Sequence, residues 1–224
     1  MVRCFGQTGI LDEVNIDIIY IIIVIGVILV SMTLHEAMHA YVSYWLGDHT
    51  AKLQGRLTLN PIKHIDPFLT VLLPVMLAAV GAPVFGGAKP VPVNPYALRW
   101  GEWGMALVTI AGPFTNLLIA FIAFGVWVLA GSPDQSVWTL VFSTAVYVNL
   151  GFFIFNMIPI PPLDGSRVLY ALAPEFVRRG MEAIERYGLV IIFALVLVVG
   201  DSFGIFISSG VNLFIEVFSK IFIR

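Results

Sequence analysis

Charged residues are scarce in this sequence. Only 12% of its 224 residues are Asp, Glu, Lys or Arg, and 59% are hydrophobic, whereas a soluble globular domain carries about 25% charged residues. This imbalance excludes an ordinary soluble domain and predicts a protein of several membrane spans, with the lipid bilayer as its surroundings. The formal net charge of −2 offers no excess of positive charge for nucleic acid, so we expect no nucleic-acid partner.

Cysteine is almost absent, and no cleaved secretory leader is expected. The single cysteine, Cys4, excludes a disulfide within the chain and leaves the redox compartment undetermined. A secretory leader places basic residues before a short apolar stretch and a small-residue cleavage site. Here the apolar run begins only at Ile16 and continues beyond Thr33, so we expect it to be retained.

Five apolar segments are long enough to cross a hydrocarbon core of about 30 Å, which needs roughly 17–25 helical residues. They are approximately residues 16–46, 103–130, 136–158, 184–200 and 203–222. The sequence has no internal repeat and no low-complexity tract, and we expect no appended soluble domain. We therefore expect an all-α polytopic membrane protein with five to six transmembrane helices in one domain, residues 1–224.

A sixth apolar stretch, residues 67–87, is ambiguous because Pro67, Pro74 and Pro83 interrupt it. It is predicted to be either a short span or a re-entrant segment. The following "AKPVPVNP", residues 88–95, alternates Val and Pro and cannot form a helix interior. We expect a short extended element or β-hairpin there, before the third core element.

Lysine and arginine favour the re-entrant alternative. If the first helix runs from outside to inside and residues 67–87 turn back, 11 of the 12 basic residues are cytoplasmic and only Arg3 is outside. A full crossing would place four of the positive charges between Arg167 and Arg186 outside, against the positive-inside rule. This topology places the N-terminus outside and the C-terminus in the cytoplasm.

Two histidines and a glutamate lie within the first apolar helix. His35, Glu36 and His39 form H-E-x-x-H, in which the histidines lie on one face, one turn apart, and can bind one metal. Glu36 points roughly 100° away and is placed to act as a general base toward a water. Simple packing of the histidines is the alternative, but ionisable residues inside a membrane are functional candidates.

A catalytic zinc site usually has three protein ligands, and the third must come from elsewhere. Asp164 follows the proline-broken "NMIPIPPLDG", residues 156–165, and irregular backbone at membrane depth is tolerated where it is covered or wet. Asp164 is alternatively a helix N-cap. Glu182 or Glu185 is the alternative third ligand. His35 and Asp164 both lie toward the far end of a helix, so the two helices are expected to run parallel.

Together these motifs resemble the site-2 protease family of intramembrane zinc metalloproteases, peptidase family M50. The resemblance rests on HEAMH at residues 35–39 and N-x-x-P-x-P-x-x-D-G at residues 156–165. Further matches are the stretches 47–67 and 86–95 and the "AGPFTN" of residues 111–116. The match covers about residues 33–165 and is to compact members that lack a PDZ domain and a CBS domain. The two terminal helices match nothing specific.

The resemblance implies one Zn²⁺ held by His35, His39 and Asp164, with Glu36 as the base. It also implies hydrolysis of peptide bonds in membrane-spanning helices of a protein substrate. Asn156 matches the motif asparagine that contacts substrate or supports the oxyanion, and Asn116 matches a family G-x-x-x-N element with Gly112. Either asparagine is alternatively a structural hydrogen-bonding group between helices.

On this resemblance, the catalytic core is expected at about residues 16–170 and the C-terminal helices at about 184–222. The location is then the plasma membrane of a prokaryote, and the sequence leaves the oligomeric state open. A different class of function remains possible, namely a metal transporter or a non-catalytic metal-binding membrane protein. A transporter would offer several ligand sites along a pathway, whereas this sequence has one histidine cluster.

Overall fold

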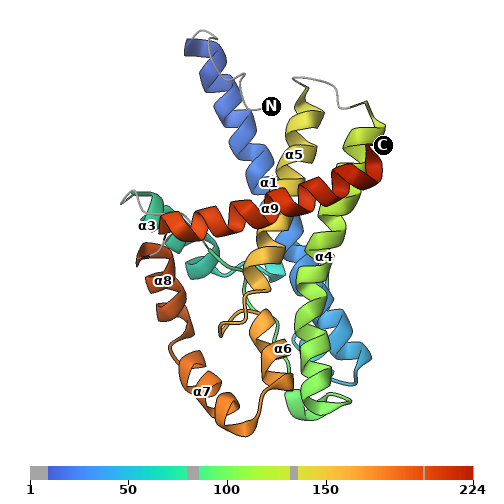
Figure 1. Ribbon diagram of the computed structural model, residues 1–224, viewed down its shortest axis with the longest axis vertical. Helices are drawn as coiled ribbons and strands as arrows, with labels where there is room; N and C mark the ends of the chain where they lie inside the picture. Colours follow the sequence, from blue (N-terminus) through green and yellow to red (C-terminus); the bar gives the residue numbers. More distant parts are fainter. Residues whose placement is uncertain (1–9, 80–85, 132–135, 199, 224) are drawn as a thin grey trace.

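The computed structural model describes residues 10–79, 86–131, 136–198 and 200–223. Three long helices, α1 (Ile10–Trp45), α4 (Gly101–Leu129) and α5 (Val137–Asn156), run along the long axis of the molecule. The colours of Figure 1 show that α4 runs opposite to α1 and α5. The two helices that carry the H-E-x-x-H motif and lead to Asp164 are therefore parallel, as the sequence predicted.

The core between α4, α5 and α9 (Gly200–Phe222) is apolar and rich in aromatic residues. Ala120 and Phe124 of α4 pack with Leu150 of α5 and with Phe218 of α9 in one buried cluster. Figure 1 shows α9 crossing in front of α4 and α5 rather than lying along them. The C-terminal helix therefore closes over the two core helices.

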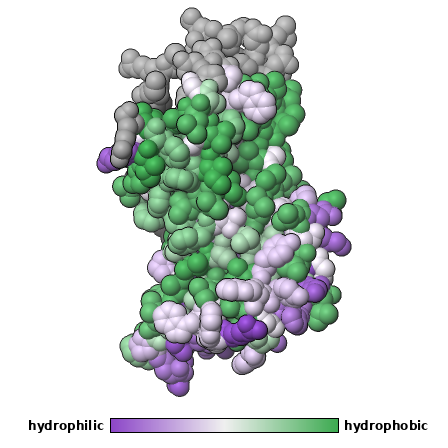
Figure 2. Space-filling model, turned by 90° about the vertical axis from the view of Figure 1, so that its right-hand side faces the viewer, coloured by the Kyte–Doolittle hydropathy of each residue, from purple (hydrophilic) through white to green (hydrophobic). Residues whose placement is uncertain are grey.

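Among the described residues, four helices are long and apolar enough to cross a membrane: 18–45, 101–129, 137–156 and 202–222. The expected span at residues 184–200 is not among them. Its charged beginning ends the amphipathic helix α7 (Glu175–Glu185), and the apolar remainder, α8 (Gly188–Val198), has 11 residues, too few to span. Figure 2 shows hydrophobic residues over the middle and upper part of one face and polar residues at the lower end.

The residues on either side of the 67–87 stretch are hydrogen-bonded to each other. A π-helix (η2, Pro67–Leu72) leads into α3 (Leu73–Ala79), and the positions 80–85 of this segment lie outside the described residues. Thr70 donates its hydroxyl to the Gly87 carbonyl at 2.7 Å. The backbone N–H of Lys89 donates to the His64 carbonyl at 2.9 Å. The two ends of the segment are therefore adjacent.

The β-hairpin expected around residues 88–95 is not formed. Residues 86–94 have no regular secondary structure, and the described part of the chain contains no strand. Prolines alternate with residues that have a backbone N–H, so a strand ladder would lose every second donor. The N–H groups of Val91 and Asn94 instead donate to the side chains of Glu36 and Asp48. Side chains of the α1 region thus replace a partner strand.

Candidate metal centre

The histidine pair lies in the buried half of α1, facing α4. His35 and His39 are each 7% exposed, and their Nε2 atoms lie 3.0 Å apart. A four-residue spacing on a helix places two side chains on one face. A direct contact between two imidazole nitrogens has at most one hydrogen bond to offer, whereas one cation would satisfy both lone pairs.

Asp164 completes the cluster from the loop between α5 and α6 (Gly165–Leu172). Its Oδ2 lies 3.1 Å from Nε2 of His35 and 3.5 Å from Nε2 of His39. Asp164 precedes α6, yet its side chain makes no capping hydrogen bond. The carboxylate therefore faces the histidines rather than the helix terminus. The side chain of Asp164 does not act as a helix cap.

Both imidazoles are held from behind by their Nδ1 atoms. His39 Nδ1 lies 2.7 Å from the Val108 carbonyl, and His35 Nδ1 lies 2.6 Å from Asn116 Oδ1. An oxygen acceptor on Nδ1 keeps the hydrogen there and leaves the Nε2 lone pair for a ligand bond. These contacts are typical of the groups that orient metal-binding histidines.

Two glycines make the close approach of the three elements possible. A Cβ on Gly112 of α4 would lie 2.5 Å from the His39 ring and 2.6 Å from Nε2 of His35. A Cβ on Gly165 would lie 2.3 Å from the Met157 carbonyl, so the turn that presents Asp164 also needs a glycine. The absence of a side chain at Gly112 and at Gly165 therefore allows the histidines and Asp164 to come together.

Glu36 lies beside this cluster without belonging to it. Its side chain is buried, and Oε2 accepts the Val91 N–H at 3.0 Å. Arg56, also buried, donates to the Lys89 carbonyl. Burial lowers the pKa of the Arg56 guanidinium, and the charge of Glu36 acts in the opposite direction. The segment of residues 89–91 is thus fixed between an arginine and Glu36.

The remaining predicted residues are placed apart from the cluster. Asn156 donates to the Phe152 carbonyl of its own helix at 3.0 Å and is half-buried. Glu185 pairs with Arg167, and Glu182 accepts the Tyr170 hydroxyl at 2.6 Å. That hydrogen bond raises the pKa of Tyr170 to about 12, with burial and the charge of Glu182 adding to it. The two glutamates proposed as alternative ligands thus have other partners.

Among the described residues, His35, His39 and Asp164 form the one group of three that could hold a metal ion. Their donor atoms all lie within 4.8 Å of one another. The set of two imidazoles and one carboxylate fits a catalytic zinc site, which has three protein ligands and one open position. A transporter-like series of metal sites has no counterpart in the described part of the chain.

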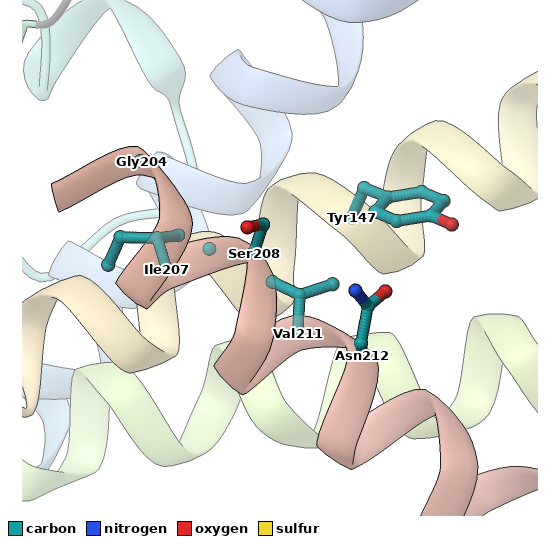
Figure 3. Close-up of a pocket in the computed structure, with 7 residues that line it drawn as sticks. Tyr147, Gly204, Ile207, Ser208, Val211 and Asn212 are labelled. Carbon is teal, nitrogen blue, oxygen red and sulfur yellow. The ribbon is translucent and has the colours of Figure 1, made fainter. Parts of the chain in front are cut away.

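A separate groove of about 410 Å³ lies between α5 and α9 (Figure 3). Its lining is largely apolar and includes Tyr147, Ser208 and Asn212, which Figure 3 labels. None of the three cluster residues lines it. The groove therefore belongs to the packing of the C-terminal helix rather than to the metal cluster.

Sequence reasoning missed two contributors to the site. The Val91 N–H on Glu36 is a backbone donor, and backbone donors have no sequence signature. Asn149 of α5 is 0% exposed and bonds Asn116. The sequence does indicate that Asn149 needs a hydrogen-bond partner, because it is an amide in the apolar run "VYVNLGFF" (146–153) and would lie at membrane depth.

Comparisons with known proteins point to zinc metalloproteases. A model of peptidase family M50 matches residues 130–199. "Putative zinc metalloprotease YwhC" of Bacillus subtilis is 40% identical over 204 residues, which cover 87% of this chain and 90% of that protein. "Putative zinc metalloprotease Rip2" of Mycolicibacterium smegmatis is 32% identical over 178 residues, which cover 79% of this chain and 67% of that protein. No solved structure matches the chain.

Proposed function

The chain belongs to peptidase family M50, and from this premise we propose that it is an intramembrane zinc endopeptidase that cuts the membrane-spanning helices of other proteins. Family membership and the names of its relatives make it a zinc metalloprotease, and its apolar helices make it a multi-pass membrane protein. The observation that carries the proposal is the convergence of His35, His39 and Asp164 on one point within the helical bundle.

His35, His39 and Asp164 would hold the zinc ion, one per chain. When bound, zinc supplies Lewis-acid chemistry, which makes a water acidic and polarises a carbonyl. Asn116 and the Val108 carbonyl keep the two imidazoles in the tautomer that this requires.

Glu36 is the proton carrier in this proposal. Its carboxylate accepts a proton from the attacking water and then gives it to the nitrogen of the leaving amine, so the base is restored at the end of the reaction. The Val91 N–H on Oε2 holds the carboxylate in place. Its burial keeps bulk water away from the carboxylate.

The segment of residues 87–93 is the proposed substrate contact. A helical substrate must unwind first, because its carbonyls are already bonded along the helix. The irregular backbone at "AKPVPV" (88–93) has edges that can accept an unwound strand. Asn156, half-buried at the end of α5, is the proposed side-chain contact for the substrate.

Residues 67–95 are proposed to be re-entrant from the cytoplasmic side, and the N-terminus to be outside. The hydrogen bond between Lys89 and His64 supports this, because it brings the two ends of the segment together. The nine lysines and arginines that lie between α1 and α9 support the orientation, because all of them would then be cytoplasmic. We also propose that the protein lies in the plasma membrane of a prokaryote.

Glu36→Gln is the decisive test, because it preserves shape and removes the proton acceptor. Wild type and variant would be purified in detergent and analysed for zinc. Each would then be mixed with tagged single-span test proteins, one of which carries a Gly-Pro break in its span, and fragments identified by mass spectrometry. We expect equal zinc, with cleavage only by the wild type. Cleavage by both would contradict the mechanism, and zinc-free wild type would contradict the site.

A further inference from the structure

A line of hydrogen-bonded side chains connects His35 to the backbone of α5. Asn116 Oδ1 lies 2.6 Å from His35 Nδ1, and Asn116 Nδ2 donates to Asn149 Oδ1 at 2.8 Å. Asn149 Nδ2 then donates to the Ala145 carbonyl at 2.8 Å. Both asparagines are 0% exposed, so bulk solvent does not reach their side chains.

The carbonyl at the far end determines the direction of every bond in this line. A backbone carbonyl only accepts, so Asn149 must turn its nitrogen toward Ala145 and its oxygen toward Asn116. Asn116 must then turn its nitrogen toward Asn149 and its oxygen toward His35. That oxygen accepts a hydrogen from Nδ1, which leaves the Nε2 lone pair of His35 on the side of His39 and Asp164.

The reverse arrangement is excluded by the same carbonyl. If His35 carried its hydrogen on Nε2, Asn116 would have to offer its nitrogen to Nδ1 and its oxygen to Asn149. Asn149 would then have to direct its nitrogen to Asn116 and its oxygen toward the Ala145 carbonyl. Two acceptors would then face each other away from bulk solvent, which is costly in a buried site.

We propose that Asn149 is a positioning residue for the metal centre, which acts through Asn116 to fix the tautomer of His35. This inference rests on the proposed zinc site. His39 needs no such relay, because the Val108 carbonyl contacts its Nδ1 directly. Without Asn149, Asn116 is free to rotate its amide, and His35 loses the preference for Nδ1–H. Loss of a group that orients a ligand typically lowers metal affinity 10- to 100-fold.

The first measurement is zinc affinity, by competition with a chelator, on the full chain in detergent. Asn149→Leu keeps the branched shape of the side chain and removes both polar atoms, and we expect zinc to bind about 10-fold more weakly. Thr144→Val is the matched control, because it removes a buried hydroxyl from the same helix without touching the line. The visible spectrum of the Co²⁺-substituted protein is expected to change in Asn149→Leu and to stay the same in the control.

A second background separates positioning from general damage. Asn116→Asp keeps an oxygen on His35 but no longer offers nitrogen to Asn149, so His35 no longer depends on Asn149. We expect Asn149→Leu to cost no zinc affinity in this background. An equal loss in both backgrounds, or no loss in either, would overturn the proposal.

If leucine prevents folding, Asn149→Ala takes its place in both backgrounds, and a folding defect that is equal in both also counts against the proposal. Failure of the zinc site itself would look different. In that case, wild type would bind no zinc, or His35→Ala would bind it as wild type does.

Discussion

The backbone N–H of Val91 donates to Glu36 Oε2 at 3.0 Å, although the two residues are 55 positions apart in the chain. Val91 lies between Pro90 and Pro92, neither of which has an N–H to offer. Val91 is therefore the residue of the Pro90–Pro92 stretch that has a backbone N–H to donate. The carboxylate proposed as the general base is oriented by the segment proposed to contact the substrate, so the two roles are coupled by one hydrogen bond.

Val91→Pro removes this donor, and we expect it to lower kcat about 10-fold while zinc content stays unchanged. A hydrogen bond to a charged group contributes about 1.5–3 kcal/mol. Without it, the Glu36 carboxylate can rotate out of the orientation needed for proton transfer. Val91→Ala keeps the N–H and should retain most of the activity. Turnover of tagged test helices by the two variants checks this, and equal activity of Val91→Pro and Val91→Ala would refute the coupling.

Gly112→Ala should abolish tight zinc binding without unfolding the protein. The added methyl would lie 2.5 Å from the His39 ring, closer than two such atoms approach, so an imidazole must move. Gly151→Ala in α5 is the control, because its Cβ meets nothing within 4 Å. Zinc content and thermal unfolding of the purified variants test this. Normal zinc in Gly112→Ala would mean that α4 does not approach the histidines so closely.

Asp164→Ala is expected to lose zinc, whereas Glu182→Ala and Glu185→Ala should keep it. The last two carboxylates are engaged with Tyr170 and Arg167. Zinc that binds only the folded state stabilises it by about 2.7 kcal/mol at 100 times its Kd. A chelator should therefore lower the unfolding temperature of the glutamate variants but not of Asp164→Ala. Full zinc in Asp164→Ala would assign the third ligand elsewhere.

Arg56→Gln should loosen residues 87–93 and leave the zinc ligands in place. The buried guanidinium donates to the Lys89 carbonyl, and a glutamine cannot reach as far. We expect faster hydrogen exchange in this segment and weaker turnover. Arg179→Gln is the control, because Arg179 forms an exposed ion pair with Glu175, and such pairs contribute about 0–1 kcal/mol. Unchanged exchange in Arg56→Gln would exclude this anchoring role.

The grouping of His35, His39 and Asp164 was predictable from the sequence because each lies in a local pattern. A four-residue spacing defines a helix face before any tertiary structure is known, and a proline-broken stretch marks where Asp164 leaves its helix. The parallel direction of α1 and α5 followed from the need to bring both ends together. The helix face of the two histidines and the break before Asp164 depend only on residues near them in the chain. Both features are therefore kept when the protein folds.

The features that failed or were missed depend on distant neighbours. The hairpin at residues 88–95 was wrong because Glu36 and Asp48 accept the N–H groups that a strand partner would need. The span expected at 184–200 is not among the long apolar helices of the described residues, because Glu185 and Arg186 belong to the amphipathic helix α7 and its end. Asn149 could not be assigned to His35 without knowing that α4 lies between them.

Cysteine labelling tests the topology and the chemistry together. In a Cys4→Ser background, single cysteines at Lys63 and Lys89 replace exposed residues at the two ends of the returning segment. The Lys89 N–H bonds the His64 carbonyl, so we expect both cysteines to react with an impermeant reagent from the cytoplasmic side alone. A cysteine at Leu129, which is 82% exposed at the opposite end of α4, should react only from outside. Reaction of position 89 from outside would require a full crossing by residues 67–87. The helix leading to Asp164 would then run opposite to α1, and His35 and Asp164 could not share a metal ion at one depth.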